Sequence, residues 1–90
     1  MTIKVTAKQF EFSPSEITVT KGQPVLLELT SLDVRHGLNC PGLGIRADIN
    51  PHQVTQLRFT PKKAGKFPFH CDVFCGIGHG TMTGTIIVKE

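Results

Sequence analysis

The sequence predicts an all-β fold, a sandwich or barrel of about seven short strands. Apolar and polar residues alternate with a period of two in most segments, as half-buried strands require. No window of about eleven residues carries a helical stripe, because glycine or proline interrupts most candidates. Turn-forming residues separate the alternating segments at near-regular spacing, which favours a single β domain over residues 1–90.

The strand-like segments can be placed along the chain one by one. In order they are IKVTAKQFEF (3–12), EITVT (16–20), PVLLELT (24–30), QVTQLRFT (53–60), KFPFHC (66–71) and GTIIVK (84–89). In the fifth segment Phe67, Phe69 and Cys71 share one face, so this side is expected to point into the core. Between the segments lie the turn signals Ser13-Pro14-Ser15, Lys21-Gly22, Asn50-Pro51 and 61–65.

Composition is that of a soluble globular protein, with 39% hydrophobic and 19% charged residues among 90. No apolar run exceeds three residues, far below the roughly 18 to 20 that a membrane-spanning helix needs. Met1 leads directly into strand-like sequence rather than into a signal peptide. We therefore expect either a cytosolic protein or a soluble piece whose targeting or anchoring segment lies outside this chain.

The formal net charge of +3 supports at most a mild preference for acidic partners. Lys62, Lys63 and Lys66 cluster, but no aromatic residues interleave with them as a base-stacking surface would need. We expect no nucleic-acid partner.

The segment HCDVFCGIGHGTM, residues 70–82, gathers side chains that can bind a soft metal. Cys71 and Cys75 are four residues apart, His79 follows after four more, and Met82 after a further three. Thiolates, a thioether and imidazoles together suit Cu(I), and they tolerate Cu(II) or zinc.

This segment has a definite place on the predicted scaffold. Cys71 ends one strand and Gly84 begins the last, so 72–83 form a loop that several glycines allow to turn tightly. A histidine from an earlier strand end at the same pole could complete the site. His36, in DVRHGLN just after the PVLLELTSL strand, is the candidate.

Several kinds of site are compatible with these donors. The two cysteines with His36 and His79 would form a complete tetrahedral zinc site, but the thioether of Met82 is a poor zinc ligand. A redox disulfide between Cys71 and Cys75 is geometrically possible. However, the spacing is C-x3-C rather than C-x2-C, and no helix N-terminus follows to lower a thiol pKa. A catalytic thiol would need an orienting group and an oxyanion site, and the sequence signals neither.

Copper fits the set best. Cys75, His79 and Met82 with the upstream His36 would make the His2Cys site with a weak axial methionine that holds one copper in blue copper proteins. Cys71 is then surplus. A second thiolate at this distance can bridge two metal ions together with the first, so that each copper has two shared sulfurs and one imidazole.

The string CDVFCGIGHGTM resembles the purple binuclear copper (CuA) motif, C-x3-C-x3-H-x2-M. SLDVRHGLN is similar to the segment SPDVxHGF of that family. QFEFSPSEITVTKGQPV, GIRADINPHQVTQLRFTPKKAGKF and GTIIVKE resemble the CuA domain of subunit II in heme-copper oxidases, nearest to the ba3 type of thermophilic bacteria. The resemblance covers essentially the whole chain and implies a cupredoxin-like Greek-key β-sandwich.

The resemblance also implies two copper ions and their ligands. These are the bridging thiolates of Cys71 and Cys75, the imidazoles of His36 and His79, and two weak ligands, the backbone carbonyl of Val73 and the thioether of Met82. The carbonyl would belong to the copper that His79 binds, and the thioether to the copper that His36 binds. An electron shared by two coppers in a rigid β framework changes bond lengths little, which suits a relay rather than a catalyst.

The implied function is one-electron transfer. The domain would take electrons from a c-type cytochrome or a small copper protein and pass them to a heme in subunit I of a cytochrome c oxidase. It would face the periplasm or the outer side of the cytoplasmic membrane, attached only through a segment that this chain lacks. Rival interpretations are the CuA domain of a nitrous-oxide or nitric-oxide reductase, a mononuclear cupredoxin, a copper chaperone or storage protein, and a zinc-stabilised structural domain.

Two departures from the family pattern matter. Many oxidase subunits have, at the position of Val73, a glutamate that also binds magnesium, so we expect no such second metal here. The tryptophan-rich segment that receives electrons in many relatives is missing. Phe10 or Phe12, in QFEF, would supply an apolar docking surface instead.

The remaining cysteine and histidines are expected to have no part in the metal site. Cys40 is predicted to be a small buried hydrophobe. His70 should point to the opposite face of its strand from Cys71, and His52, in NPHQ, should lie in a loop.

Overall fold

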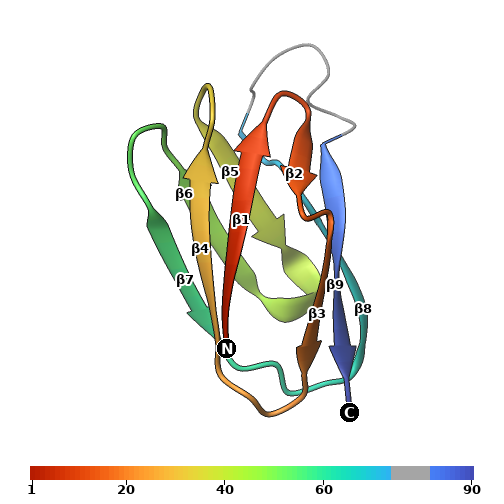
Figure 1. Cartoon of the computed structure of the whole chain (residues 1–90). Helices are drawn as coiled ribbons and strands as arrows, with labels where there is room; N and C mark the ends of the chain where they lie inside the picture. Colours follow the sequence, from red (N-terminus) through yellow and green to blue (C-terminus); the bar gives the residue numbers. More distant parts are fainter. Residues whose placement is uncertain (74–81) are drawn as a thin grey trace.

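The computed structural model describes residues 1–73 and 82–90. Within them, nine strands and one short 3-10 helix form two sheets (Figure 1). The predicted all-β sandwich is confirmed.

One sheet has four strands. In spatial order they are β2 (Glu11–Ser13), β1 (Thr2–Lys8), β4 (Val25–Ser31) and β7 (Thr55–Phe59). β1 runs parallel to β4, and the other two pairs are antiparallel. A parallel central pair means that β1 and β4 are joined through the other sheet rather than by a hairpin.

The other sheet has five strands. In spatial order they are β3 (Glu16–Thr20), β9 (Thr83–Lys89), β8 (Gly65–His70), β5 (His36–Cys40) and β6 (Ile45–Ile49). β3 and β9 are parallel, and the remaining neighbours are antiparallel. The 3-10 helix η1 (Pro41–Leu43) connects β5 to β6.

The described part has nine strands rather than about seven, for two reasons. The predicted segment 3–12 is divided between β1 and β2, which pair with each other as a hairpin. β5 and β6 were not predicted as strands at all. Four of the five residues of β5 are buried, so both of its faces are covered and its sequence does not alternate.

The core lies between the two sheets. Fully buried apolar side chains come from both layers, among them Val5, Leu27 and Leu29 from the first sheet and Leu38 and Ile86 from the second. Side chains of this size each stabilise the fold by about 1.5 to 3 kcal/mol when buried. The candidate metal ligands are therefore attached to strands whose inner faces form a closely packed core.

Phe12 and Phe69 join the two sheets. Their rings meet edge to face with centroids 5.0 Å apart, and each is at most 2% exposed. The expectation that Phe12 could serve as a docking surface is wrong, because its ring fills the core. Phe10, two residues earlier, is 38% exposed.

Gly84 lies within β9, directly opposite Phe69 of β8. A Cβ atom at this position would be 2.3 Å from Cζ of Phe69 and 2.6 Å from the carbonyl oxygen of Ser15. A residue without a side chain is needed here because the phenyl ring lies directly against the backbone.

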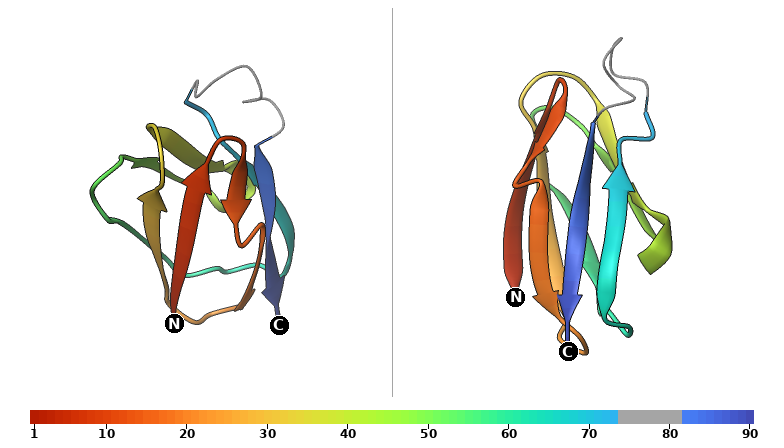
Figure 2. Two further views of the ribbon diagram at one scale, coloured as in Figure 1. Left: turned by 45° about the horizontal axis from the view of Figure 1, so that its top comes forward. Right: turned by 90° about the vertical axis from the view of Figure 1, so that its right-hand side faces the viewer.

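The start of β5, the end of β8 and the start of β9 lie at one end of the sandwich, away from both chain termini (Figures 1 and 2). This pole brings His36 next to residues that are distant in sequence. No helix among the described residues is long and apolar enough to span a membrane.

Candidate metal centre

His36 is the first residue of β5, and its side chain is fully buried. Its Nε2 lies 2.7 Å from Oδ1 of Asp33, and its Nδ1 lies 4.0 Å from Sγ of Cys71. A carboxylate accepts a hydrogen bond, so the ring proton belongs on Nε2 and the lone pair on Nδ1 is directed toward the thiol. A buried imidazole whose second nitrogen donates to a carboxylate is the usual arrangement of a metal-binding histidine.

Asp33 is held in turn by the backbone. Its Oδ2 accepts the N–H of Gln9 at 2.8 Å, and its Oδ1 accepts the N–H of Val34 at 2.6 Å. Burial opposes the charge of Asp33, but hydrogen bonds from Gln9, His36 and Val34 outweigh it and keep the pKa of this carboxyl below its usual range. Asp33 is therefore an anion at neutral pH and a fixed support for the imidazole.

Cys71 follows the last residue of β8 and is buried. Its Sγ lies 3.1 Å from the carbonyl oxygen of Val73, and its backbone N–H donates to the carbonyl of Met82 at 3.0 Å. Met82, directly before β9, is fully buried, and Val73 is half-buried against the core. The structure thus brings His36, Cys71, Val73 and Met82 to one pole.

Cys75 and His79, the other two predicted ligands, lie outside the described residues. Within 1–73 and 82–90, no group of three or more histidine, cysteine and carboxylate side chains is close enough to hold a metal ion. The described residues therefore include only part of the predicted ligand set. That part is an imidazole whose Nδ1 faces a thiol, together with a thioether and the carbonyl of Val73, and it fits copper.

A cluster of charged side chains covers the outer face of the five-stranded sheet beside this pole. The guanidinium of Arg46 contacts both carboxylate oxygens of Asp72, with Nε to Oδ2 at 2.7 Å and Nη2 to Oδ1 at 3.0 Å. Its Nη1 lies 2.7 Å from Oδ1 of Asp48, which also pairs with Arg35 at 3.1 Å. The hydrogen bond from Arg46 holds the pKa of Asp72 below its usual range.

Sequence reasoning missed Asp33, Asp72 and Arg46. Asp33 carried a usable signal, since it is an acidic residue three positions before a candidate ligand. The pair of Asp72 with Arg46 carried none, because the two residues are 26 positions apart.

The other sequence candidates lie as expected. Cys40 is fully buried, with Sγ 3.8 Å from the carbonyl oxygen of Phe67. Burial raises the pKa of the Cys40 thiol, which therefore stays neutral and unreactive. His70 and His52 are both exposed, and His52 lies in the segment between β6 and β7.

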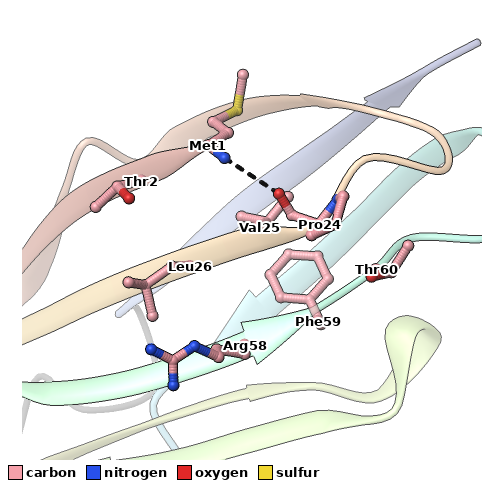
Figure 3. A pocket seen from close by; sticks show the side chains of 8 residues that line it. All are labelled: Met1, Thr2, Pro24, Val25, Leu26, Arg58, Phe59 and Thr60. Carbon is pink, nitrogen blue, oxygen red and sulfur yellow. Dashed lines mark hydrogen bonds between the residues drawn. The ribbon is translucent and has the colours of Figure 1, made fainter.

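A hollow of about 450 Å³ lies at the N-terminal ends of β1 and β4, where the ammonium group of Met1 donates to the carbonyl of Pro24 at 3.2 Å (Figure 3). Arg58 is the one charged side chain among the described residues that line it, and none of them is a histidine or cysteine. This hollow lacks the chemistry of the metal pole.

Comparison with known families identifies the fold. A sequence model of the Cupredoxin-like domain matches residues 1–88. The chain belongs to the cupredoxin-like family. This cupredoxin-like domain is also similar to the periplasmic domain of subunit II of cytochrome oxidase from Bradyrhizobium japonicum. The TM-score is 0.91 at 24% identity, over 100% of this chain and 84% of that one, which shows a shared fold.

The sequence relatives include two kinds of enzyme. The domain is 38% identical over 89 residues to cytochrome c oxidase subunit 2 of Thermus thermophilus, covering 99% of this chain and 66% of that protein. It is 32% identical over 93 residues to the nitrous-oxide reductase of Cupriavidus necator, covering 99% of this chain and 14% of the reductase. The cupredoxin-like domain thus spans just under two thirds of the oxidase subunit and a small part of the reductase.

Proposed function

We propose that this cupredoxin-like domain is a one-electron carrier with a binuclear copper centre of the CuA type, relaying electrons to a terminal oxidase. One observation carries the proposal. At the pole where the C-x3-C-x3-H-x2-M segment begins, buried His36 directs Nδ1 at Cys71 while Asp33 holds Nε2. The similarity to cytochrome c oxidase subunit 2 supports it. On this proposal residues 1–90 are one domain.

The ligands in this proposal are the six that the sequence predicts. They are His36, Cys71, Cys75, His79, Met82 and the backbone carbonyl of Val73. When bound, the two copper ions would accept and release one electron at a time. The chain's contribution is rigidity, because Asp33 holds the imidazole and the strands on both sides of the loop are paired with neighbours. Val73 has no carboxylate, so the proposal includes no magnesium ion.

The partners belong to the proposal as well. We propose a c-type cytochrome or a small copper protein as donor and the heme of an oxidase subunit I as acceptor, at the outer, periplasmic side of the membrane. Phe10, with Leu32 and Val34, would form the apolar docking surface. Leu32 is 65% and Val34 is 41% exposed, and they flank Asp33 in sequence. The hydrogen bond from Gln9 to Asp33 brings Phe10 to the same loop.

A nitrous-oxide reductase is the second candidate parent, because the similarity to the Cupriavidus necator enzyme extends over 99% of this chain. The copper site and its ligands would be the same in that case. Only the acceptor would differ.

Anaerobic titration of the reduced apo-protein with copper, followed by EPR and visible spectra, tests the proposal. We expect two coppers per chain, a purple product, and hyperfine splitting shared over two equivalent nuclei. One copper with a four-line pattern would show that Cys71 does not bridge and would overturn the binuclear site. A colourless, redox-silent protein that prefers zinc would overturn electron transfer altogether.

Replacing Met82 by leucine separates a copper site from a zinc site. The two side chains are close in volume, so we expect the free energy of unfolding of the apo-protein to change by less than about 1.5 kcal/mol. Since a weak axial thioether tunes a copper site, the reduction potential of the loaded protein should shift. Voltammetry of both proteins checks this. An unchanged potential in Met82→Leu would remove Met82 from the ligand set.

A further inference from the structure

The outer face of the five-stranded sheet carries a cross-strand ion-pair clamp, made of Arg46, Asp72 and Asp48. Arg46 and Asp48 project from β6, and Asp72 lies just beyond β8. β5 runs between these two strands in the sheet, so the side chain of Arg46 must reach across it to meet Asp72. The contact is bidentate, with N···O distances of 2.7 and 3.0 Å, and such fork-like pairs define orientation as well as distance.

Gly37 leaves the space that the clamp occupies. A Cβ atom on Gly37 would lie 2.2 Å from Oδ1 of Asp72, 2.9 Å from Cγ2 of Val73 and 3.1 Å from Nη2 of Arg46. The carboxylate, the valine side chain and the guanidinium therefore all rest on bare backbone of β5. Gly37 is also the residue directly after His36.

The clamp acts on a short piece of chain between two proposed copper ligands. Asp72 separates Cys71 from Val73, and Sγ of Cys71 is 3.1 Å from the carbonyl of Val73. Backbone pairing of β5 with β8 in the described residues is limited to one register pair, Asn39 with His70. Main-chain pairing therefore ties the end of β8 only weakly to the strand that begins with His36. Side-chain hydrogen bonds of Asp72 with Asn39 of β5 and with Arg46 of β6 add to it.

We propose that Arg46 is a positioning residue for the metal centre: through Asp72 it holds Cys71 and the carbonyl of Val73 in register with His36 across Gly37. The expected effect on the copper site rests on the proposed function. The positioning of Asp72 by Arg46 rests on the ion-pair geometry alone. Arg46 acts through Asp72, because its hydrogen bonds and ion pairs in the described part of the chain are with Asp72 and Asp48.

The test compares Arg46→Gln with a matched control, Arg35→Gln. Both substitutions remove one guanidinium that pairs with Asp48, and both side chains are about half exposed, at 41% and 56%. Of the two arginines, only Arg46 contacts Asp72. After copper loading, we expect Arg46→Gln to make the hyperfine splitting unequal over the two nuclei and to shift the visible bands. Arg35→Gln should match the wild type in both spectra.

Two further variants show whether the effect passes through Asp72. Arg46→Lys keeps the charge but cannot form the fork, so its spectra should fall between those of wild type and Arg46→Gln. The double variant Arg46→Gln with Asp72→Asn should show no larger change in its spectra than Arg46→Gln alone. The first substitution has already removed the ion pair between the two residues. Additive changes in the double variant would overturn the proposed route.

Amide hydrogen exchange of the apo-protein tests the clamp without any metal. The N–H of Cys71 donates to the carbonyl of Met82, so its exchange reports how well this segment is held. We expect exchange at Cys71 to be about tenfold faster in Arg46→Gln, the size expected from losing a charge-assisted hydrogen bond. Arg35→Gln should leave it unchanged.

The outcomes of the two measurements are distinct. Equal exchange at Cys71 in the two glutamine variants would overturn the clamp, whatever the metal content. A wild-type protein that fails to take up two coppers would overturn the proposed function, and faster exchange in Arg46→Gln would still establish the clamp. Faster exchange with unaltered copper spectra would overturn the positioning role.

Discussion

Cys71→Ala is expected to lose two-copper binding completely while the sandwich still folds. The thiolate is the ligand that distinguishes a binuclear site from a mononuclear one, because Cys75, His36, His79 and Met82 already suffice for a single copper. Removing one buried sulfur atom should lower the free energy of unfolding of the apo-protein by about 1 kcal/mol. The copper content after anaerobic loading and the EPR spectrum measure the first effect, and urea unfolding measures the second.

Cys40→Ala is the matched control. Cys40 is fully buried in the same five-stranded sheet as the strand that Cys71 follows, yet its thiol faces the carbonyl of Phe67 rather than His36. The Cys40→Ala variant should bind two coppers with an unchanged spectrum. Its free energy of unfolding should fall by about as much as that of Cys71→Ala. Two equivalent coppers in Cys71→Ala, or loss of one copper in Cys40→Ala, would contradict the ligand assignment.

Asp33→Ala is expected to lower the free energy of unfolding by about 2 to 4 kcal/mol, since hydrogen bonds to a charged group are worth about 1.5 to 3 kcal/mol each. The substitution removes the carboxylate that accepts from the N–H groups of Gln9 and Val34 and from Nε2 of buried His36. Asp48→Ala is the control for the chemical change, because its partners Arg35 and Arg46 are solvent-exposed surface cations. It should cost less than about 1 kcal/mol. Equal losses in the two variants would contradict the structural role of Asp33.

The same carboxylate predicts a pH dependence. Its pKa is lower in the folded protein than the 3.8 of an unperturbed aspartate, so the unfolded chain binds the proton more readily. The stability that Asp33 contributes is therefore present above about pH 4 and is lost as the pH falls through the folded pKa. Urea unfolding at a series of pH values from about 6 to 2 should show a smaller loss in Asp33→Ala than in the wild type. Parallel curves would mean that Asp33 does not titrate differently in the two states.

Local features of this protein could be predicted from the sequence. The alternation in segments such as 16–20 and 24–30 determines which side chains enter the core, because successive residues in a strand face opposite sides. The spacing of Cys71, Cys75, His79 and Met82 identifies a soft-metal motif, since ligands a few residues apart in one loop can meet without knowledge of the fold. The position of His36 at a strand end sufficed to propose it as a partner.

Features that depend on contacts between distant segments could not be predicted. β5 is a strand because β6 and β8 pair with its two edges, not because its own sequence alternates. The sequence allowed Phe12 to lie at the surface, but the packing of the two sheets places its ring against Phe69.

The contacts that hold the candidate ligands at the metal pole also join segments that are distant in sequence. Asp33 binds Gln9 across 24 residues, and Arg46 binds Asp72 across 26, so neither contact exists until the strands have taken their order and register. The sequence by itself determined the chemistry of the donors, because that chemistry belongs to residue types. The tertiary structure determined how the donors are held, because orientation depends on which strands lie side by side.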